Sequence, residues 1–221
     1  MKITIQEETT KNPISLIGKE AGICWGADIE NKKKNYKRGI SCIESNHGRT
    51  LEFPQVYLTL EDISARVGRE IYTHIGGSPS RLQSSTRYIN YKDFDYIIPP
   101  KIEKNEEAKK IYTSLMKEIS KTYHVLEIYD LSKEDIANIL PMGMTTKIVI
   151  RTNFRHLRDI MMVGQCKRAY WEFRDVMKAI KNELSNYSDE WATIVENYMP
   201  IKCEEVGFCT EEYCCGHRKK R

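Results

Sequence analysis

Alternating hydrophobic and polar positions predict short strands and loops in the first part of the chain, residues 1–60. Residues 2–5 (Lys-Ile-Thr-Ile) and 55–60 (Gln-Val-Tyr-Leu-Thr-Leu) alternate in the way that half-buried strands do. The β-branched run from Thr145 to Thr152 predicts a further strand. The sequence contains no internal repeat and no low-complexity tract.

Hydrophobic positions three to four residues apart predict helices in most of the remaining chain. Ile63, Val67 and Ile71 follow this spacing and predict a helix over 61–73. Asn153 is a suitable N-cap for a long helix that continues to about residue 183. The other helices expected are 104–124, a short one that starts at the Ser132 capping box and ends at Pro141, and 187–198.

The composition predicts a globular, soluble protein without a membrane-spanning segment. A chain of 221 residues with 40% hydrophobic residues can bury a core, and we expect one domain over 1–200 followed by a Cys-rich basic tail over 201–221. No apolar run approaches the roughly 20 residues of a membrane span, and the first residues lack the apolar core of a signal peptide. A cytoplasmic location is therefore expected. The net charge of +4 is too small to predict nucleic-acid binding.

Cysteines gather near the carboxyl end of the chain. Of seven cysteines, four are Cys203, Cys209, Cys214 and Cys215, and His217 follows. In an intracellular protein such residues are reduced thiols or metal ligands. The spacing is not the paired C-x-x-C of common zinc sites, so the two alternatives are a zinc site and unliganded thiols, and we assign no metal ligand.

A segment rich in Ser, Gly and Arg follows the helix predicted over 61–73. In residues 72–88, Gly76 and Gly77 allow close approach of a ligand to the backbone, and the hydroxyls can donate to phosphate oxygens. Arg81 and Arg87 supply positive charge. The alternative is an ordinary polar loop with a turn at 78–79. The composition is suited to a phosphorylated ligand.

A second polar cluster lies where the long helix is expected to start. It consists of Arg151, Asn153, Arg155, His156 and Arg158, with Lys167, Arg168 and Trp171 further along. One helix face could carry several of these groups toward a ligand. The alternative is a solvated basic face with Trp171 in the core. Neither a P-loop nor the G-x-G-x-x-G fingerprint is present.

The order of these pieces resembles the flavin-dependent thymidylate synthases. The resemblance covers about residues 40–180. The matching pieces are His47 with Glu52, Ser64 with His74, Ser85-Thr86-Arg87-Tyr88, Leu140-Pro141, Asn153-Phe154-Arg155 and Ala169-Tyr170-Trp171-Glu172-Phe173-Arg174.

This resemblance implies a fold and a reaction. The fold is α/β (α+β), with an antiparallel or mixed sheet, a long central helix and further helices, assembled as a homotetramer whose subunits share active sites. The reaction is the reductive methylation of dUMP to dTMP. FAD is the cofactor, and NADPH and methylenetetrahydrofolate are co-substrates. Cys166 needs no catalytic role, because the family is thought to use no cysteine nucleophile.

The resemblance also implies roles for individual residues. The flavin-binding residues expected from it are Thr73, His74, Ile75, Gln83, Arg49, Glu52, Asn153 and Arg155. The residues expected at the nucleotide are Glu70, Arg81, Ser84, Ser85, Thr86, Arg87 and Arg168, and Ser85 and Arg168 are the expected catalytic residues.

Several positions depart from the family pattern. Thr73 and Ile75 stand where the family's Arg-His-Arg signature has arginines, and Gly164 stands where an Arg contacts the uracil ring. Arg81, and Arg168 one helical turn from Gly164, are expected to compensate. Two alternatives stay open: a related enzyme that hydroxymethylates or methylates another pyrimidine nucleotide, and a non-catalytic nucleotide-binding homologue.

Overall fold

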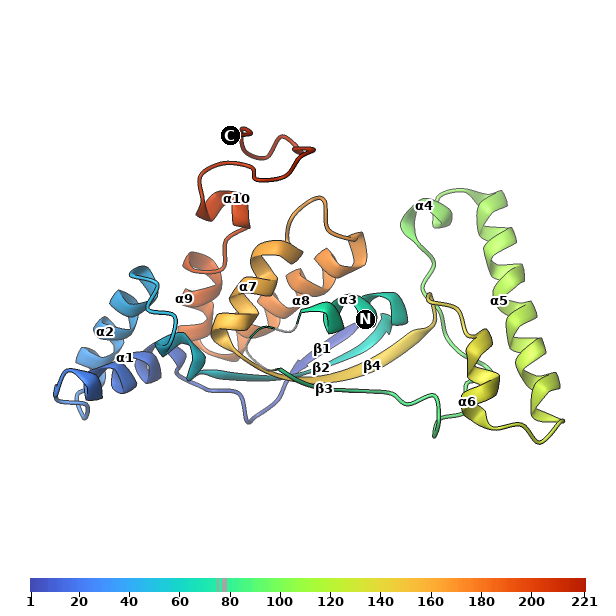
Figure 1. Cartoon of the computed structure of the whole chain (residues 1–221), viewed down its shortest axis with the longest axis horizontal. Coiled ribbons are helices and arrows are strands. Elements are labelled where there is room, and N and C mark those ends of the chain that lie inside the picture. Colours follow the sequence, from blue (N-terminus) through green and yellow to red (C-terminus); the bar gives the residue numbers. More distant parts are fainter. Residues whose placement is uncertain (75, 77–78) are drawn as a thin grey trace. The chain divides into compact units, whose positions relative to one another are not determined.

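The fold is a mixed α/β arrangement around one sheet, as expected from the sequence. A computed structural model describes residues 1–74, 76 and 79–221 (Figure 1). Four strands form the sheet in the order β1-β2-β4-β3. Their bounds are β1 (Lys2–Ile5), β2 (Gln55–Ser64), β3 (Ser80–Gln83) and β4 (Thr145–Asn153).

Backbone hydrogen bonds show that the pairing is antiparallel. At one end of the β2–β4 pair the Phe154 N–H donates to the Pro54 carbonyl, and at the other the Ala65 N–H donates to the Met144 carbonyl. The strands predicted at 2–5, 55–60 and 145–152 are confirmed, although β2 is longer than expected. Strand β3 was not predicted, because it lies inside the Ser-rich segment.

The contacts of the chain divide it into two compact units. The first unit comprises residues 1–2, 60–73 and 82–148, and the second comprises residues 3–59, 74–81 and 149–221. Each of the four strands contributes residues to both units. In the described part of the chain no helix is both long and apolar enough to cross a membrane.

The second unit is mainly helical. Its helices are α1 (Pro13–Cys24), α2 (Lys32–Glu44), the 3-10 turn η1 (Thr50–Glu52), α7 (Phe154–Gly164), α8 (Trp171–Tyr187), α9 (Asp189–Asn197) and α10 (Lys202–Glu205). Trp191 of α9 is fully buried and meets the Phe154 ring edge-on, with 5.8 Å between the ring centroids. Its indole N–H donates to the Thr10 carbonyl at 2.8 Å, so the polar end of this core residue is satisfied.

Helices α1 and α2 correct the prediction of strands and loops over residues 1–60. They pack against each other through glycines: a Cβ at Gly18 would lie 1.8 Å from the Asn35 carbonyl oxygen, and one at Gly39 would lie 1.9 Å from the Ile14 oxygen. Glycine has a low helix propensity, and α2 begins with a run of lysines, so the pattern did not indicate helices. The close backbone contact explains why glycine is needed at both positions.

The single long helix predicted over 154–183 is wrong, because the structure has two helices there. Helix α7 ends at Gly164, residues 165–170 form a turn, and α8 begins at Trp171. A Cβ at Gly164 would lie 2.7 Å from Met177 Cγ and 2.8 Å from Phe173 Cε1. The chain therefore folds back so that α8 packs on α7. Because each helix has an apolar face, the hydrophobic periodicity continues across the turn and predicts a single helix.

The first unit carries the remaining helices. They are α3 (Ala65–Thr73), α4 (Pro100–Glu103), α5 (Glu106–Glu127), α6 (Lys133–Ile136) and the 3-10 turn η2 (Ala137–Ile139). Helix α3 starts four residues later than predicted, because β2 continues to Ser64, whose hydroxyl accepts the Val67 N–H. The prediction of α5 is confirmed, as is the Ser132 cap of α6. Figure 1 shows α5 and α6 next to each other.

Candidate functional site

In the second unit, the segment after α3 packs on the beginning of α7 and on α8. The His74 ring lies parallel to the buried Phe173 ring, with 5.5 Å between centroids and 3° between planes. The Arg81 guanidinium donates to the His74 carbonyl at 2.8 Å, and the Arg151 guanidinium donates to Ser80 Oγ at 3.2 Å. The sequence-predicted residues His74 and Arg81 are thus brought together, with Arg151 beside them.

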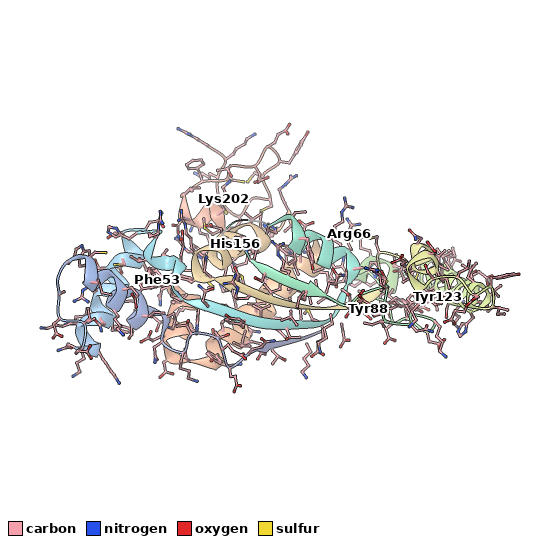
Figure 2. All side chains as sticks on the ribbon, turned by 60° about the horizontal axis from the view of Figure 1, so that its bottom comes forward. Phe53, Arg66, Tyr88, Tyr123, His156 and Lys202 are labelled. Atoms are coloured by element: carbon pink, nitrogen blue, oxygen red, sulfur yellow. The ribbon has the colours of Figure 1, made fainter. Side chains whose placement is uncertain are left out.

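His156, labelled in Figure 2, lies in α7 and contacts the segment that carries His74 and Gly76. It is only 4% exposed, its ring is hydrogen-bonded to the His74 backbone, and a Cβ at Gly76 would stand 3.0 Å from Nδ1. Its Nε2 is buried and lacks a hydrogen-bond partner within the described residues. A buried nitrogen of this kind is costly unless a ligand or solvent satisfies it. From the sequence, His156 belongs to the second polar cluster but has no predicted role; its position three residues after the N-cap Asn153 was the available signal.

Burial lowers the pKa of His156, and this gives a testable dependence of stability on pH. The hydrogen bond to His74 opposes the shift, but burial outweighs it. Since the folded pKa lies below the unfolded value, the unfolded chain binds more protons, and stability falls as pH drops from about 6.5 toward the folded pKa. We expect His156→Gln to flatten the change in the urea unfolding midpoint between about pH 7 and about pH 5. An unchanged slope would contradict this account of the buried ring.

A turn before β2 meets the first residues of α7. Arg155 forms an ion pair with Glu52 at 2.7 Å, and the same guanidinium lies over Gly48, where a Cβ would be 2.9 Å from Cζ. Asn153 caps α7, because its side-chain oxygen accepts the His156 N–H at 2.9 Å. Its predicted role as N-cap is confirmed. Three of the residues expected at the flavin thus adjoin one helix start, and Arg49 lies exposed in the neighbouring turn.

In the first unit, four of the predicted nucleotide residues, Ser84 to Arg87, lie in a turn that follows β3. Gln83 donates to Thr146 Oγ1 at 3.2 Å, and the Ser84 N–H extends the pairing with Lys147. The Arg87 N–H donates to Ser85 Oγ at 3.2 Å, and this side-chain hydrogen bond stabilises a turn over Ser85-Thr86-Arg87. The Arg87 side chain is 67% exposed and pairs with Glu134 at 2.7 Å.

Glu70 and Thr73, two further predicted site residues, lie on α3. Glu70 is exposed on α3, and its carbonyl accepts the Thr73 hydroxyl at 2.6 Å. Ile75, the predicted neighbour of His74 in the degenerate signature, lies outside the described residues.

Arg168 does not lie one helical turn from Gly164, because it belongs to the turn between α7 and α8. Its guanidinium donates to the Tyr213 carbonyl at 2.6 Å, approaches Glu211 at 3.9 Å and lies over the Tyr213 ring. Gly164 is buried against the side chains of Met177 and Phe173, so a larger residue at this position of the chain would require both side chains to shift. The helical relation assumed between the two residues is therefore wrong, and Arg168 contacts the C-terminal segment instead.

Comparisons with known proteins give a consistent result. The Thy1 family, described as "Thymidylate synthase complementing protein", matches residues 7–188. A flavin-dependent thymidylate synthase of Nitratidesulfovibrio vulgaris is 27% identical over 205 residues, covering 87% of this chain and 81% of that protein. Another, of Thermococcus onnurineus, is 29% identical over 169 residues, covering 75% and 68%.

A solved structure shows the same fold. The flavin-dependent thymidylate synthase of Helicobacter pylori, complexed with FAD and dUMP, superposes with a TM-score of 0.67 over 87% of this chain and 99% of that one, at 16% identity. The family match covers most of the chain, including both groups of residues described above. The chain therefore belongs to the Thy1 family.

Proposed function

We propose that the protein is a flavin-dependent thymidylate synthase that converts dUMP to dTMP. The observation that carries the proposal is the family match over residues 7–188, which includes the turn at Ser85–Arg87 and the start of α7. The similar proteins of N. vulgaris and T. onnurineus bear this name. Methylenetetrahydrofolate is the proposed carbon donor and NADPH the proposed reductant, as the sequence resemblance implies.

The residues of the second unit fit FAD. Arg81, Arg151 and Arg155 present guanidinium groups near the start of α7, and such groups bind diphosphate oxygens well. The buried Nε2 of His156 is a polar atom that a ligand could satisfy. When bound, the flavin supplies the hydride. We propose that this unit binds the isoalloxazine ring of the flavin beside His74 and excludes water from it.

The turn in the first unit fits the phosphate end of the nucleotide. Ser84, Ser85 and Thr86 offer hydroxyls on a backbone already closed into a turn, and Arg87 supplies a mostly exposed cation. Hydroxyls and backbone N–H groups in a turn can donate hydrogen bonds to an anion. We propose that Ser85 and Arg87 bind the phosphate and thereby position the pyrimidine, which lowers the barrier by orientation. A direct role of Arg168 at the pyrimidine remains a prediction, since its guanidinium would have to leave Tyr213 and Glu211.

A homotetramer with shared active sites is part of the proposal. Along α5, the apolar side chains of Ile111, Leu115 and Val125 are exposed, and their spacing places them close to one face of the helix. Exposed apolar side chains on one face are typical of a surface that another chain covers. The proposed location is the cytoplasm, and the proposed partners are small molecules with no membrane or nucleic acid.

Visible absorption of the purified protein tests the function. We expect added FAD to bind and give a yellow protein that NADPH bleaches, with the colour returning when dUMP and methylenetetrahydrofolate are added. A protein that takes up no FAD would contradict the proposal and favour a non-catalytic nucleotide-binding homologue. A pyrimidine other than dUMP that restores the colour more effectively would identify a related enzyme with another substrate.

A further inference from the structure

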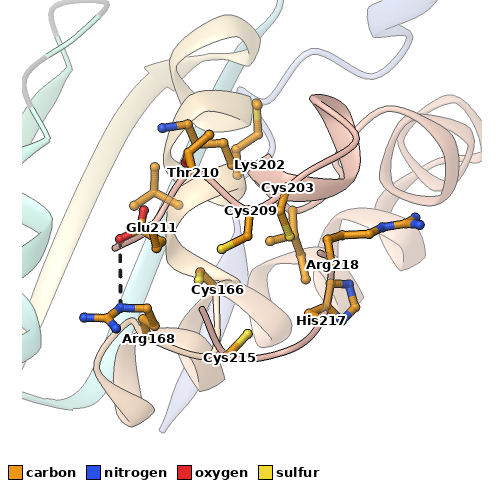
Figure 3. A pocket seen from close by; sticks show the side chains of 13 residues that line it. Cys166, Arg168, Lys202, Cys203, Cys209, Thr210, Glu211, Cys215, His217 and Arg218 are labelled. Atoms are coloured by element: carbon orange, nitrogen blue, oxygen red, sulfur yellow. Dashed lines mark ion pairs between the residues drawn. The ribbon is translucent and has the colours of Figure 1, made fainter. Parts of the chain in front are cut away.

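The C-terminal segment, residues 206–221, contacts the turn between α7 and α8, and both belong to the second unit. A pocket of about 120 Å³ lies between them, and four cysteines line it: Cys166, Cys203, Cys209 and Cys215 (Figure 3). Among the described residues no three His, Cys, Asp or Glu side chains are placed to hold one metal ion, and every cysteine is a free thiol. The proposed reaction uses none of these thiols, so any role they have is separate from it.

Cys209 and Cys214 lie side by side in this segment, because the end of the chain returns past both. The Cys209 N–H donates to the Lys219 carbonyl at 2.9 Å, and the Cys214 thiol donates to the Arg218 carbonyl at 3.1 Å. Arg218 and Lys219 are consecutive, with Cα atoms about 3.8 Å apart, so both cysteines are fixed against one short stretch of chain. Their side chains are also hydrogen-bonded to each other. The pair thus meets the first condition for a disulfide, which is that the two side chains point toward each other.

The two thiols differ in accessibility and in protonation. Cys214 is half-buried whereas Cys209 is only 6% exposed, so a small oxidant reaches Cys214 first. The hydrogen bond from the Glu211 N–H lowers the pKa of Cys209, but the hydrogen bond with Cys214 and burial outweigh it and raise the pKa overall. Because the thiolate is the nucleophile, Cys209 is suited to react second, after Cys214 has been oxidised.

The residues between the two cysteines hold Arg168 of the turn between α7 and α8. The Arg168 guanidinium donates to the Tyr213 carbonyl at 2.6 Å, lies over the Tyr213 ring and approaches Glu211 at 3.9 Å (Figure 3). The Lys220 ammonium donates to the Glu212 carbonyl at 3.0 Å. A covalent bond between positions 209 and 214 would restrict the conformations of this loop and so keep the Arg168 contacts in place.

We propose that Cys209 and Cys214 form a reversible disulfide that closes residues 209–214 into a loop and secures the C-terminal segment to the turn between α7 and α8. The oxidant is a small-molecule disulfide. The Cys214 thiolate attacks one of its sulfurs and releases one thiol, which leaves a mixed disulfide; the Cys209 sulfur then attacks the Cys214 sulfur and releases the second thiol. The two hydrogens and two electrons that the protein loses are gained by the two released thiols.

Peptide mapping of the full chain tests the bond. The reduced protein is treated with glutathione disulfide, the remaining thiols are alkylated, and a protease that cleaves after Glu cuts the chain at Glu211 and Glu212, between the two cysteines. We expect the peptides on either side to stay joined until a reductant is added, with a mass about 2 Da below that of the two reduced peptides together. Peptides that are never joined, or a disulfide between other cysteines, would overturn the proposal.

Single substitutions assign the pair. We expect Cys209→Ser and Cys214→Ser each to abolish the joined peptides. Cys215→Ser is the matched control, because Cys215 is the next residue along the chain but lines the pocket instead, and it should keep them. Joined peptides in Cys214→Ser, or their loss from Cys215→Ser, would overturn the assignment.

Limited digestion with trypsin tests whether the bond secures the turn. Residues 165–170 offer trypsin the exposed Lys167 and Arg168. We expect the oxidised protein to be cleaved there at least about 5-fold more slowly than the reduced protein, because the closed loop opens less often. Cys214→Ser should be cleaved at one rate under oxidising and reducing conditions. Equal rates for the oxidised and reduced forms of the unsubstituted protein would overturn the proposal. Neither experiment depends on the proposed reaction.

Discussion

Replacement of Arg87 by Ala is expected to raise the KM for dUMP by roughly 10- to 150-fold, with a smaller effect on kcat. The range follows from the loss of one charge-assisted contact to phosphate, about 1.5 to 3 kcal/mol. Arg87 is exposed at the Ser85 turn and its only ion pair given by the described residues is with Glu134, so it is available to an anion. Steady-state kinetics with varied dUMP measure both constants. For Arg87→Lys we expect a KM for dUMP between those of the unchanged protein and Arg87→Ala, since lysine keeps the charge but lacks the planar guanidinium.

Glu134→Gln separates ligand binding from a structural role of the same arginine. This variant removes the ion pair but leaves the guanidinium in place. If Arg87 binds phosphate, the KM for dUMP should stay the same or fall, because a competing anion is gone. A KM in Glu134→Gln as high as in Arg87→Ala would show that the ion pair, and not the nucleotide, requires Arg87.

Replacement of Gly18 by Ala is expected to destabilise the second unit by about 3 kcal/mol, at the upper end of the overpacking range. The new Cβ would stand 1.8 Å from the Asn35 carbonyl oxygen and 2.6 Å from the Gly39 nitrogen, and both are backbone atoms of α2. Neither can move without shifting the helix. Urea unfolding monitored by circular dichroism measures the loss.

Gly68→Ala is the matched control for this effect. Gly68 is also a buried helix glycine, but its Cβ would lie 3.2 Å from Ile148 Cδ1, the end of a flexible side chain. The intrinsic preference of Ala over Gly in a helix, about 1 kcal/mol, should offset this contact. Equal destabilisation by both substitutions would contradict the account of α1–α2 packing.

Local sequence patterns predicted those elements whose stability depends on their own residues. The alternation in 55–60, the caps at Ser132 and Asn153 and the helix propensity of the α5 segment act within one element, and the structure confirms the elements predicted from them. The elements that were missed depend on contacts between distant residues. Helices α1 and α2 pack closely only because each has a glycine at the contact, and no local pattern in residues 13–44 indicates that contact.

The break between α7 and α8 was missed for the same physical reason. Gly164 is required by the packing of Met177 and Phe173, thirteen and nine residues further on, and periodicity does not detect a fold-back. Arg168 was expected to compensate for the arginine missing at Gly164. That prediction assumed one continuous helix through both residues, and the structure has none. Resemblance to the family identified the correct segments, but it could not place each side chain.

The candidate site was predictable in its segments and not in its details. The polar segment 72–88 and the polar cluster that starts at Arg151, at the end of β4, were both recognised from composition. Strand β3 was not, because its residues, Ser80 to Gln83, become a strand only by pairing with β4. His156 was overlooked as a site residue because its burial depends on the segment that carries His74 and Gly76. The gathering of Cys166 with the C-terminal cysteines likewise requires the turn at 165–170.

The product formed from dUMP tests the central claim most directly. Purified protein is supplied with FAD, NADPH and methylenetetrahydrofolate, and the nucleotides are separated and weighed by mass spectrometry. The account predicts dTMP, one CH2 heavier than dUMP, formed only when flavin and folate are both present. Unchanged dUMP in the presence of bound, reduced flavin would contradict it.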